Sequence, residues 1–192
     1  MYDGPITTDL RSDAAANRDR VIEAARAAFA EEGTDVKVEE IARRAGVGVG
    51  TLYRRFPSKH QLVGAILEER VSELLLLLRN SPAKSDPLTA LGEFLDAVVR
   101  MQAEDRGVLR LLAQTLGPSA YPDNINELYD VVWRLIRRGQ QSGQVRADLK
   151  KKDVPALLRM ANAAVSSSDR ACTELDAALR CSSVLLDGLR RV

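Results

Sequence analysis

Residue types that build enzyme active sites and metal centres are scarce in this chain of 192 residues. It has one histidine, two cysteines and one tryptophan, and aromatic residues make up 4% of it. With His60 as the only imidazole, a Ser-His-Asp triad or a histidine-rich zinc site elsewhere is excluded. The Glu-x-x-His pairs of a carboxylate metal site are absent too. The sequence therefore predicts no metal, no cofactor and no enzyme.

Long apolar runs are also missing. The first twenty residues contain none, so no signal peptide is expected. The longest run, Leu74 to Leu78, is far too short to span a bilayer. The two cysteines, Cys172 and Cys181, lack metal-ligand spacing, and we interpret them as reduced core thiols, with a disulfide as the alternative. These absences indicate a cytoplasmic protein with no membrane partner.

Positive and negative charges are balanced, because the chain has 28 basic and 27 acidic residues and a net charge of +1. Any surface for nucleic acid must therefore be local. Apolar residues make up 45% and charged residues 29%, which is typical of a globular protein. Alanine, leucine, arginine and glutamate dominate, and all are good helix formers.

Helical periodicity follows a short N-terminal segment, and no stretch alternates with period two for long enough to form a strand. Residues 1–11 lack periodicity and are expected to form a tail. Ser12 or Asp13 is a candidate cap for the first helix, which Gly33 ends. The next helices are expected at 38–45, 49–55 and 59–79. The clearest break lies at 80–87, and further helices follow it.

Residues 38–59 have the plan of a helix-turn-helix unit, in which two short helices are joined by a glycine-containing turn and packed on a longer first helix. Six apolar residues are expected to form its core: Ile41, Ala42, Ala45, Val47, Leu52 and Phe56. The opposite side of the 49–55 helix carries Gly50, Thr51, Tyr53 and Arg54, with Arg55 at its flank. Small residues let the backbone approach a DNA groove, and hydroxyl and guanidinium groups donate to phosphates or base edges.

Local charge favours the same interpretation. Residues 41–60 contain no acidic residue and five basic ones: Arg43, Arg44, Arg54, Arg55 and Lys59. Each neutralised phosphate contributes about −0.9 to the salt slope of DNA binding. The charge alone fits a solvated basic face equally well, and the turn and the core pattern favour DNA.

The residues Glu40–Val47, Gly50–Phe56 and Ser58-Lys59 resemble the DNA-binding signature of TetR-family transcriptional regulators, over about residues 18–66. The resemblance implies an all-α fold: an N-terminal helix-turn-helix domain, here 12–58, and a helical effector-binding and dimerisation domain, here 59–192. The 59–79 helix would link the two. It also implies a homodimer joined through a four-helix bundle of the last two helices of each subunit.

The resemblance also assigns roles by position. It implies that Thr51 and Tyr53 contact DNA and that Tyr53 and Lys59 reach phosphates. Gly48 and Val49 occupy positions where base contacts are usually made, and Gly50 one where a small residue allows close approach.

This chain departs from the family pattern at three positions. Arg55 occupies a position usually held by histidine or another aromatic residue, and its charge suits a contact with the phosphate backbone of DNA. Lys37 replaces a hydroxyl N-cap, and Gly48 replaces a frequent serine. Base readout is therefore expected to rest more on Thr51 and Arg54.

The resemblance further implies a ligand cavity among helices at about 87–142. The candidate lining residues are Phe94, Val98, Met101, Leu109, Leu112, Tyr129, Trp133 and Ile136. Ordinary core packing is the alternative for each of them. The predicted function is a dimeric repressor of a double-stranded DNA operator, released by a small, mainly hydrophobic effector. The alternative is a DNA-binding regulator without such an effector, controlled by a protein partner or constitutive.

Overall fold

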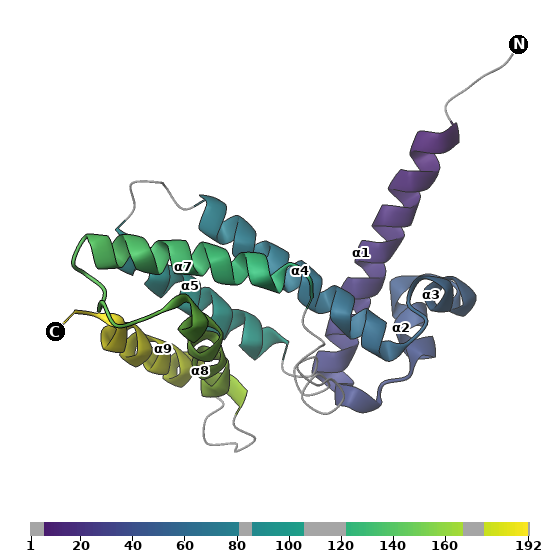
Figure 1. The fold of residues 1–192 in the computed structure, drawn as a ribbon. Coiled ribbons are helices and arrows are strands. Elements are labelled where there is room, and N and C mark those ends of the chain that lie inside the picture. Colours follow the sequence, from purple (N-terminus) through teal and green to yellow (C-terminus); the bar gives the residue numbers. More distant parts are fainter. Residues whose placement is uncertain (1–5, 81–85, 106–121, 167–174, 192) are drawn as a thin grey trace, which may run out of the picture. The chain divides into compact units, whose positions relative to one another are not determined.

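The computed structural model describes residues 6–80, 86–105, 122–166 and 175–191, and its regular structure is helical (Figure 1). The α-helices are α1 Ile6–Glu32, α2 Val38–Ala45, α3 Val49–Arg55, α4 Lys59–Asn80, α5 Pro87–Glu104, α7 Ile125–Gln141, α8 Val154–Ser166 and α9 Leu175–Leu189. Two 3₁₀ turns, η1 Gly33–Asp35 and η3 Lys151–Asp153, precede α2 and α8. The described residues form no strand, and the all-α prediction is confirmed. None of the helices in these ranges is long and apolar enough to cross a membrane.

The first helix begins earlier than predicted. We expected it to start after Ser12 or Asp13, but α1 already includes Ile6. The prediction was wrong because serine and aspartate are good caps without being helix breakers, so they also occur inside helices. The predicted end is confirmed, since Gly33 adopts a φ of 73°, a left-handed conformation that favours glycine.

The chain forms two compact units that divide within α4. The first unit extends to Ile66 and includes Asp105, and the second contains Leu67–Glu104 and the described residues from 122 onward. The boundary expected at residues 58 and 59 stays a prediction.

The core of the first unit confirms the helix-turn-helix pattern. Ile41, Ala42, Ala45, Leu52 and Phe56 are all buried, and the half-buried Val47 packs against them. They meet a buried stripe on α1: Val21, Ile22, Ala25, Ala28 and Phe29. The start of α4 adds Leu62, Val63 and Ile66 to this core. The short helices α2 and α3 are therefore held by tertiary packing, which isolated helices of their length need.

In the second unit α5 packs against α7, α8 and α9. A Cβ placed on Gly92 of α5 would lie 2.9 Å from Leu186 Cδ2 of α9, so the Leu186 side chain packs directly on α5 at this glycine. The loop after α7 joins the end of α9 through two backbone hydrogen bonds. Arg146 N donates to Leu189 O at 2.9 Å, and Arg191 N donates to Gln144 O at 2.9 Å. These two hydrogen bonds hold the end of α9 beside the loop between α7 and η3.

Candidate nucleic-acid interface

The turn between α2 and α3 depends on a glycine. Gly46 ends α2 with a φ of 65°, and its N–H donates to Arg43 O at 3.2 Å. Val47 N then donates to Ala42 O at 3.0 Å, which closes the end of α2. The next helix starts without a side-chain cap at Gly48, as α2 does at Lys37. The departures at Lys37 and Gly48 thus leave these two helix N-termini without a side-chain cap.

The two sides of α3 differ sharply in exposure. Leu52 is 1% exposed and Phe56, just after the helix, is 6% exposed, whereas Tyr53 is 42% exposed. All seven predicted residues of this helix and its N-cap are exposed: Gly48, Val49, Gly50, Thr51, Tyr53, Arg54 and Arg55. We call these seven residues the recognition surface. The hydroxyl and guanidinium groups that the sequence assigned to DNA are therefore not used in the core.

Nothing in the fold requires glycine at position 50. A Cβ built there meets no atom within 4 Å, and the backbone has no positive φ. A glycine inside a helix costs about 1 kcal/mol relative to alanine. Neither packing within the described residues nor backbone conformation therefore requires glycine at this position.

The five predicted basic contacts fall into different environments. Within the described residues, no ion pair involves Arg54 or Arg55, and both are exposed. Arg43, whose side chain is 72% exposed, donates to both oxygens of Glu40 at 2.7 and 2.8 Å. Arg44 donates to three carboxylates, those of Glu31, Glu32 and Glu40.

These arginines also change the ionisation of their partner. Hydrogen bonds from Arg43 and Arg44 lower the pKa of Glu40 to about 2. Counting only residues 41–60 missed this carboxylate, although its spacing of three and four residues to the two arginines predicts helical ion pairs. The pairing with Glu31 and Glu32 depends on how α1 and α2 pack, and no local signal could have revealed it.

Lys59 lies at the start of α4 and is part-buried. Its Nζ donates to Val36 O at 2.8 Å and lies 5.5 Å from the centroid of the Phe29 ring. Burial lowers the pKa of Lys59 from its ordinary value. Ser58 Oγ accepts from Gln61 N at 3.2 Å, which caps the start of this helix. The phosphate contact implied for Lys59 stays a prediction.

Six of the eight candidate effector residues belong to the core of the second unit or pack against it. Phe94, Val98 and Ile136 are buried there, and Met101, Tyr129 and Trp133 are half-buried against them. Leu109 and Leu112 lie outside the described residues. Gln102 follows Met101 in α5, and its Oε1 is one of three buried side-chain oxygens that accept no hydrogen bond from the part of the chain that the structure describes.

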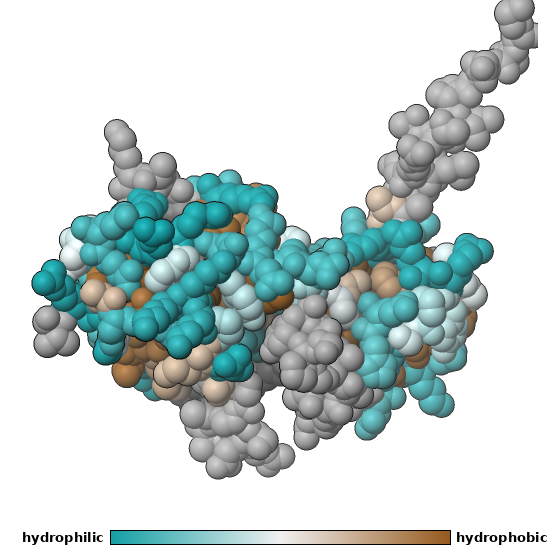
Figure 2. All heavy atoms as spheres, viewed as in Figure 1, coloured by the Kyte–Doolittle hydropathy of each residue, from teal (hydrophilic) through white to brown (hydrophobic). Residues whose placement is uncertain are grey.

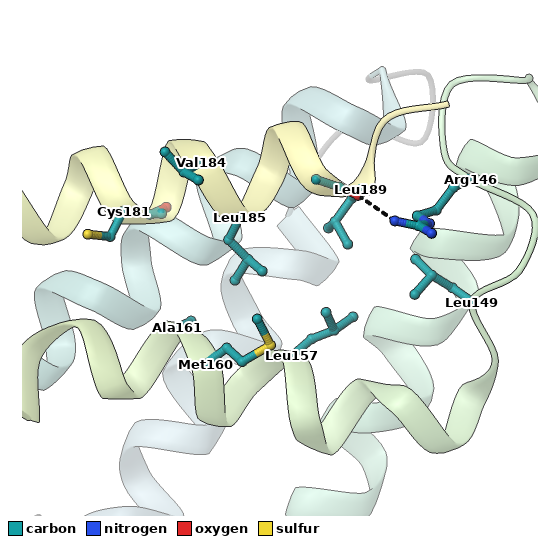
Figure 3. A pocket seen from close by; sticks show the side chains of 11 residues that line it. Arg146, Leu149, Leu157, Met160, Ala161, Cys181, Val184, Leu185 and Leu189 are labelled. Carbon is teal, nitrogen blue, oxygen red and sulfur yellow. Dashed lines mark hydrogen bonds between the residues drawn. The ribbon is translucent and has the colours of Figure 1, made fainter. Parts of the chain in front are cut away.

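The second exposed feature is an apolar groove between α8 and α9, with a volume of about 410 Å³ (Figure 3). Leu157, Met160 and Ala161 line it from α8, and Leu185 and Leu189 from α9. Figure 2 shows hydrophobic side chains gathered over these two helices. Met160 is 58% exposed and Val184 is 71% exposed, both high values for large apolar residues.

Two residues at this groove correct or extend the sequence interpretation. Cys181 lines the groove and is exposed, so its prediction as a core thiol is wrong. It is exposed, whereas its neighbour Ser182, which also lines the groove, is buried. Cys172 lies outside the described residues. Arg146 also lines the groove, from a loop without helical periodicity, and sequence patterning gave no signal for it.

The exposed α3, its glycine turn and its tri-helical core define a helix-turn-helix protein of the class that binds DNA. Residues 21–66 match the family described as bacterial regulatory proteins of the tetR family, and residues 86–191 match the C-terminal domain of SbtR-like transcriptional regulators. The chain belongs to the TetR family of transcriptional regulators, a class of DNA-binding proteins that are not enzymes.

Individual relatives agree with this assignment. A TetR regulator from Mycobacterium vanbaalenii is 38% identical, with 95% of this chain and 99% of that one covered and a TM-score of 0.67. The regulator SCO0520 from Streptomyces coelicolor is 30% identical, with 91% and 99% covered and a TM-score of 0.65. An uncharacterised HTH-type transcriptional regulator from Mycobacterium tuberculosis, Rv2250c, is 27% identical, with 88% of this chain and 90% of its own covered.

Proposed function

We propose that this protein is a homodimeric, sequence-specific repressor that a small, mainly hydrophobic effector releases from its operator. A cytoplasmic location belongs to the same proposal. The observation that carries it is the recognition surface, on which seven predicted residues of α3 and its N-cap are exposed together. Thr51, Tyr53 and Arg54 offer donors for base edges and phosphates. Gly50 supports close approach of the backbone to the DNA groove, since no atom of the described residues lies within 4 Å of a Cβ built there.

Dimerisation is proposed through the α8–α9 groove. A two-fold operator needs two recognition helices about 34 Å apart or a multiple of that distance. The groove leaves Val184 and Met160 in water, and a second copy of the same surface would cover them. This gives the proposed four-helix arrangement an apolar seam of the kind that helix bundles bury.

An effector is proposed to bind near Met101, Tyr129 and Trp133, together with Leu109 and Leu112. Gln102 Oε1 supports this, because it is a buried acceptor with no donor among the described residues, and a ligand hydroxyl or amide would satisfy it. The effector would favour a state in which α4, which contributes residues to both compact units, shifts and the two recognition helices lose the spacing of the operator.

Selection from a library of random duplexes at low salt tests DNA recognition. The full chain should enrich an inverted repeat, and failure to enrich any sequence contradicts the proposal. Phenols and medium-chain fatty acids can then be screened by thermal shift. A compound that raises the melting temperature should also weaken binding to the enriched duplex. If no compound does both, the regulator without a small-molecule effector is the better account.

A further inference from the structure

Arg44, near the end of α2, is surrounded by carboxylates. Its Nε donates to Glu40 Oε1 at 2.9 Å, and its two terminal nitrogens donate to Glu31 Oε2 at 2.6 Å and Glu32 Oε1 at 2.5 Å. Each guanidinium nitrogen thus has its own carboxylate partner. Glu31 and Glu32 are the last two residues of α1, so the contacts join the end of α1 to α2.

The charges around Arg44 oppose the phosphate contact predicted for this residue. Three carboxylates outnumber the two guanidinium groups, of Arg43 and Arg44, that face them. The Arg44 side chain is only 24% exposed, compared with 72% for Arg43. A phosphate approaching Arg44 would meet uncompensated negative charge, whereas Arg54 and Arg55 on the recognition surface have no such neighbours among the described residues.

We infer that Arg44 is a positioning residue, which fixes α2 against the end of α1 and thereby sets the direction in which α3 is presented. The inference rests on the proposed DNA-binding function and concerns how that same site is held. The positioning role requires arginine in particular, because the planar guanidinium group can donate to several carboxylates at once and the single ammonium group of lysine does not. The eight-residue α2 has no side-chain N-cap, so a polar tie near its C-terminal end supplements the core contacts.

A double variant separates a positioning role of Arg44 from a phosphate contact, because the two roles predict opposite changes in DNA affinity. Glu31→Ala/Glu32→Ala removes two negative charges, which by long-range electrostatics alone should strengthen DNA binding and would free Arg44 for a phosphate. If Arg44 positions α2, the same variant should bind the duplex enriched by the wild type about threefold to tenfold more weakly. Binding is measured by fluorescence anisotropy, well below the melting temperature of each variant.

The matched control is Glu39→Ala, which removes one carboxylate from the same helix α2. Glu39 is exposed and takes part in no ion pair among the residues described, so this control should bind as tightly as the wild type or more tightly. Arg44→Lys provides a second variant that keeps the charge. It should bind several-fold more weakly than the wild type if the fork is needed, and equally well if only a positive charge is needed.

The salt dependence of binding completes the test. Arg44→Gln should leave the slope of log K against log salt unchanged, whereas loss of a phosphate contact lowers its magnitude by about 0.9. Tighter binding by the Glu31/Glu32 variant, or a reduced slope for Arg44→Gln, overturns the inference while the wild type still binds DNA. A wild-type chain that binds no duplex overturns the proposed function itself, and the inference with it.

Discussion

The two exposed surfaces of this chain present opposite chemistry. The recognition surface on α3 consists of small, hydroxyl-bearing and cationic residues, which water solvates well. The α8–α9 groove instead exposes Met160 and Val184, while the polar groups of Arg146 are bonded to Asp148 and to Gly188 O. A polar cationic surface suits a polyanion, and an apolar one gains by leaving water. The contrast supports the proposal that the recognition surface binds DNA and the groove binds a second copy of the chain.

The largest effect is expected from a charge in the groove. Val184→Asp would bury two unpaired carboxylates at a two-fold interface and should convert the dimer to a monomer. Losing the second half-site contact should weaken operator binding about a hundredfold or more. Sedimentation velocity and anisotropy measure both. Ser183→Asp, exposed on the same helix outside the groove lining, is the control and should remain a dimer. A Val184→Asp variant that stays dimeric would refute the assignment of the groove.

Removing one cation from the recognition surface should have a smaller effect. Arg54→Ala should weaken DNA binding about tenfold, the typical loss for one base or phosphate contact. If the contact is to a phosphate, the magnitude of the salt slope also falls by about 0.9. Arg134→Ala, an exposed arginine on α7 in the other compact unit, is the matched control. Equal losses for the two variants would mean that overall charge, not the recognition surface, governs binding.

Glycine 50 offers a test in which stability and binding change in opposite directions. Gly50→Ala should raise the free energy of unfolding by about 0.5–1 kcal/mol, because alanine favours the helix and nothing obstructs its Cβ. DNA binding should nevertheless weaken several-fold. Gly64→Ala in α4, where a Cβ also meets nothing within 4 Å, should give the same stabilisation with unchanged DNA binding. Unaltered DNA binding in Gly50→Ala would remove close approach as the reason for this glycine.

The smallest effect concerns acid stability. Because the folded pKa of Glu40 is lowered from 4.5 to about 2, its ionised form stabilises the fold above pH 4.5, and this contribution disappears as the pH falls from 4.5 towards 2. The stability difference between wild type and Glu40→Gln should therefore be constant from pH 7 to 5 and shrink below pH 4.5. Urea unfolding across this range measures it. Glu39→Gln, which removes an exposed carboxylate that forms no ion pair among the described residues, is the control, and an equal pH-dependent change in both variants would contradict the role of Glu40.

The sequence predicts the first unit well because its signals are local. Core positions such as Ile41, Leu52 and Phe56 follow from helical spacing, and the turn follows from Gly46, so both are confirmed. The surroundings of Arg44 could not be predicted, because Glu31 and Glu32 reach it only once α1 packs on α2. A count of neighbouring charges in the sequence cannot show which of them are already paired.

In the second unit too, the sequence does not show which side chains end up exposed at the groove. The number and spacing of the cysteines argue against a metal site but do not show which side of a helix Cys181 occupies. Its assignment to the core is therefore wrong, since it is exposed and lines the groove. Likewise, Arg146 reaches the groove because the loop after α7 bonds to the end of α9, a contact between residues far apart in sequence.

The stoichiometry of the complex tests the central claim most directly. Sedimentation equilibrium of the full chain with a duplex carrying one enriched site should give an even number of chains per duplex, and Val184→Asp should abolish that complex at the same concentrations. A single wild-type chain bound stably to one duplex would contradict the account.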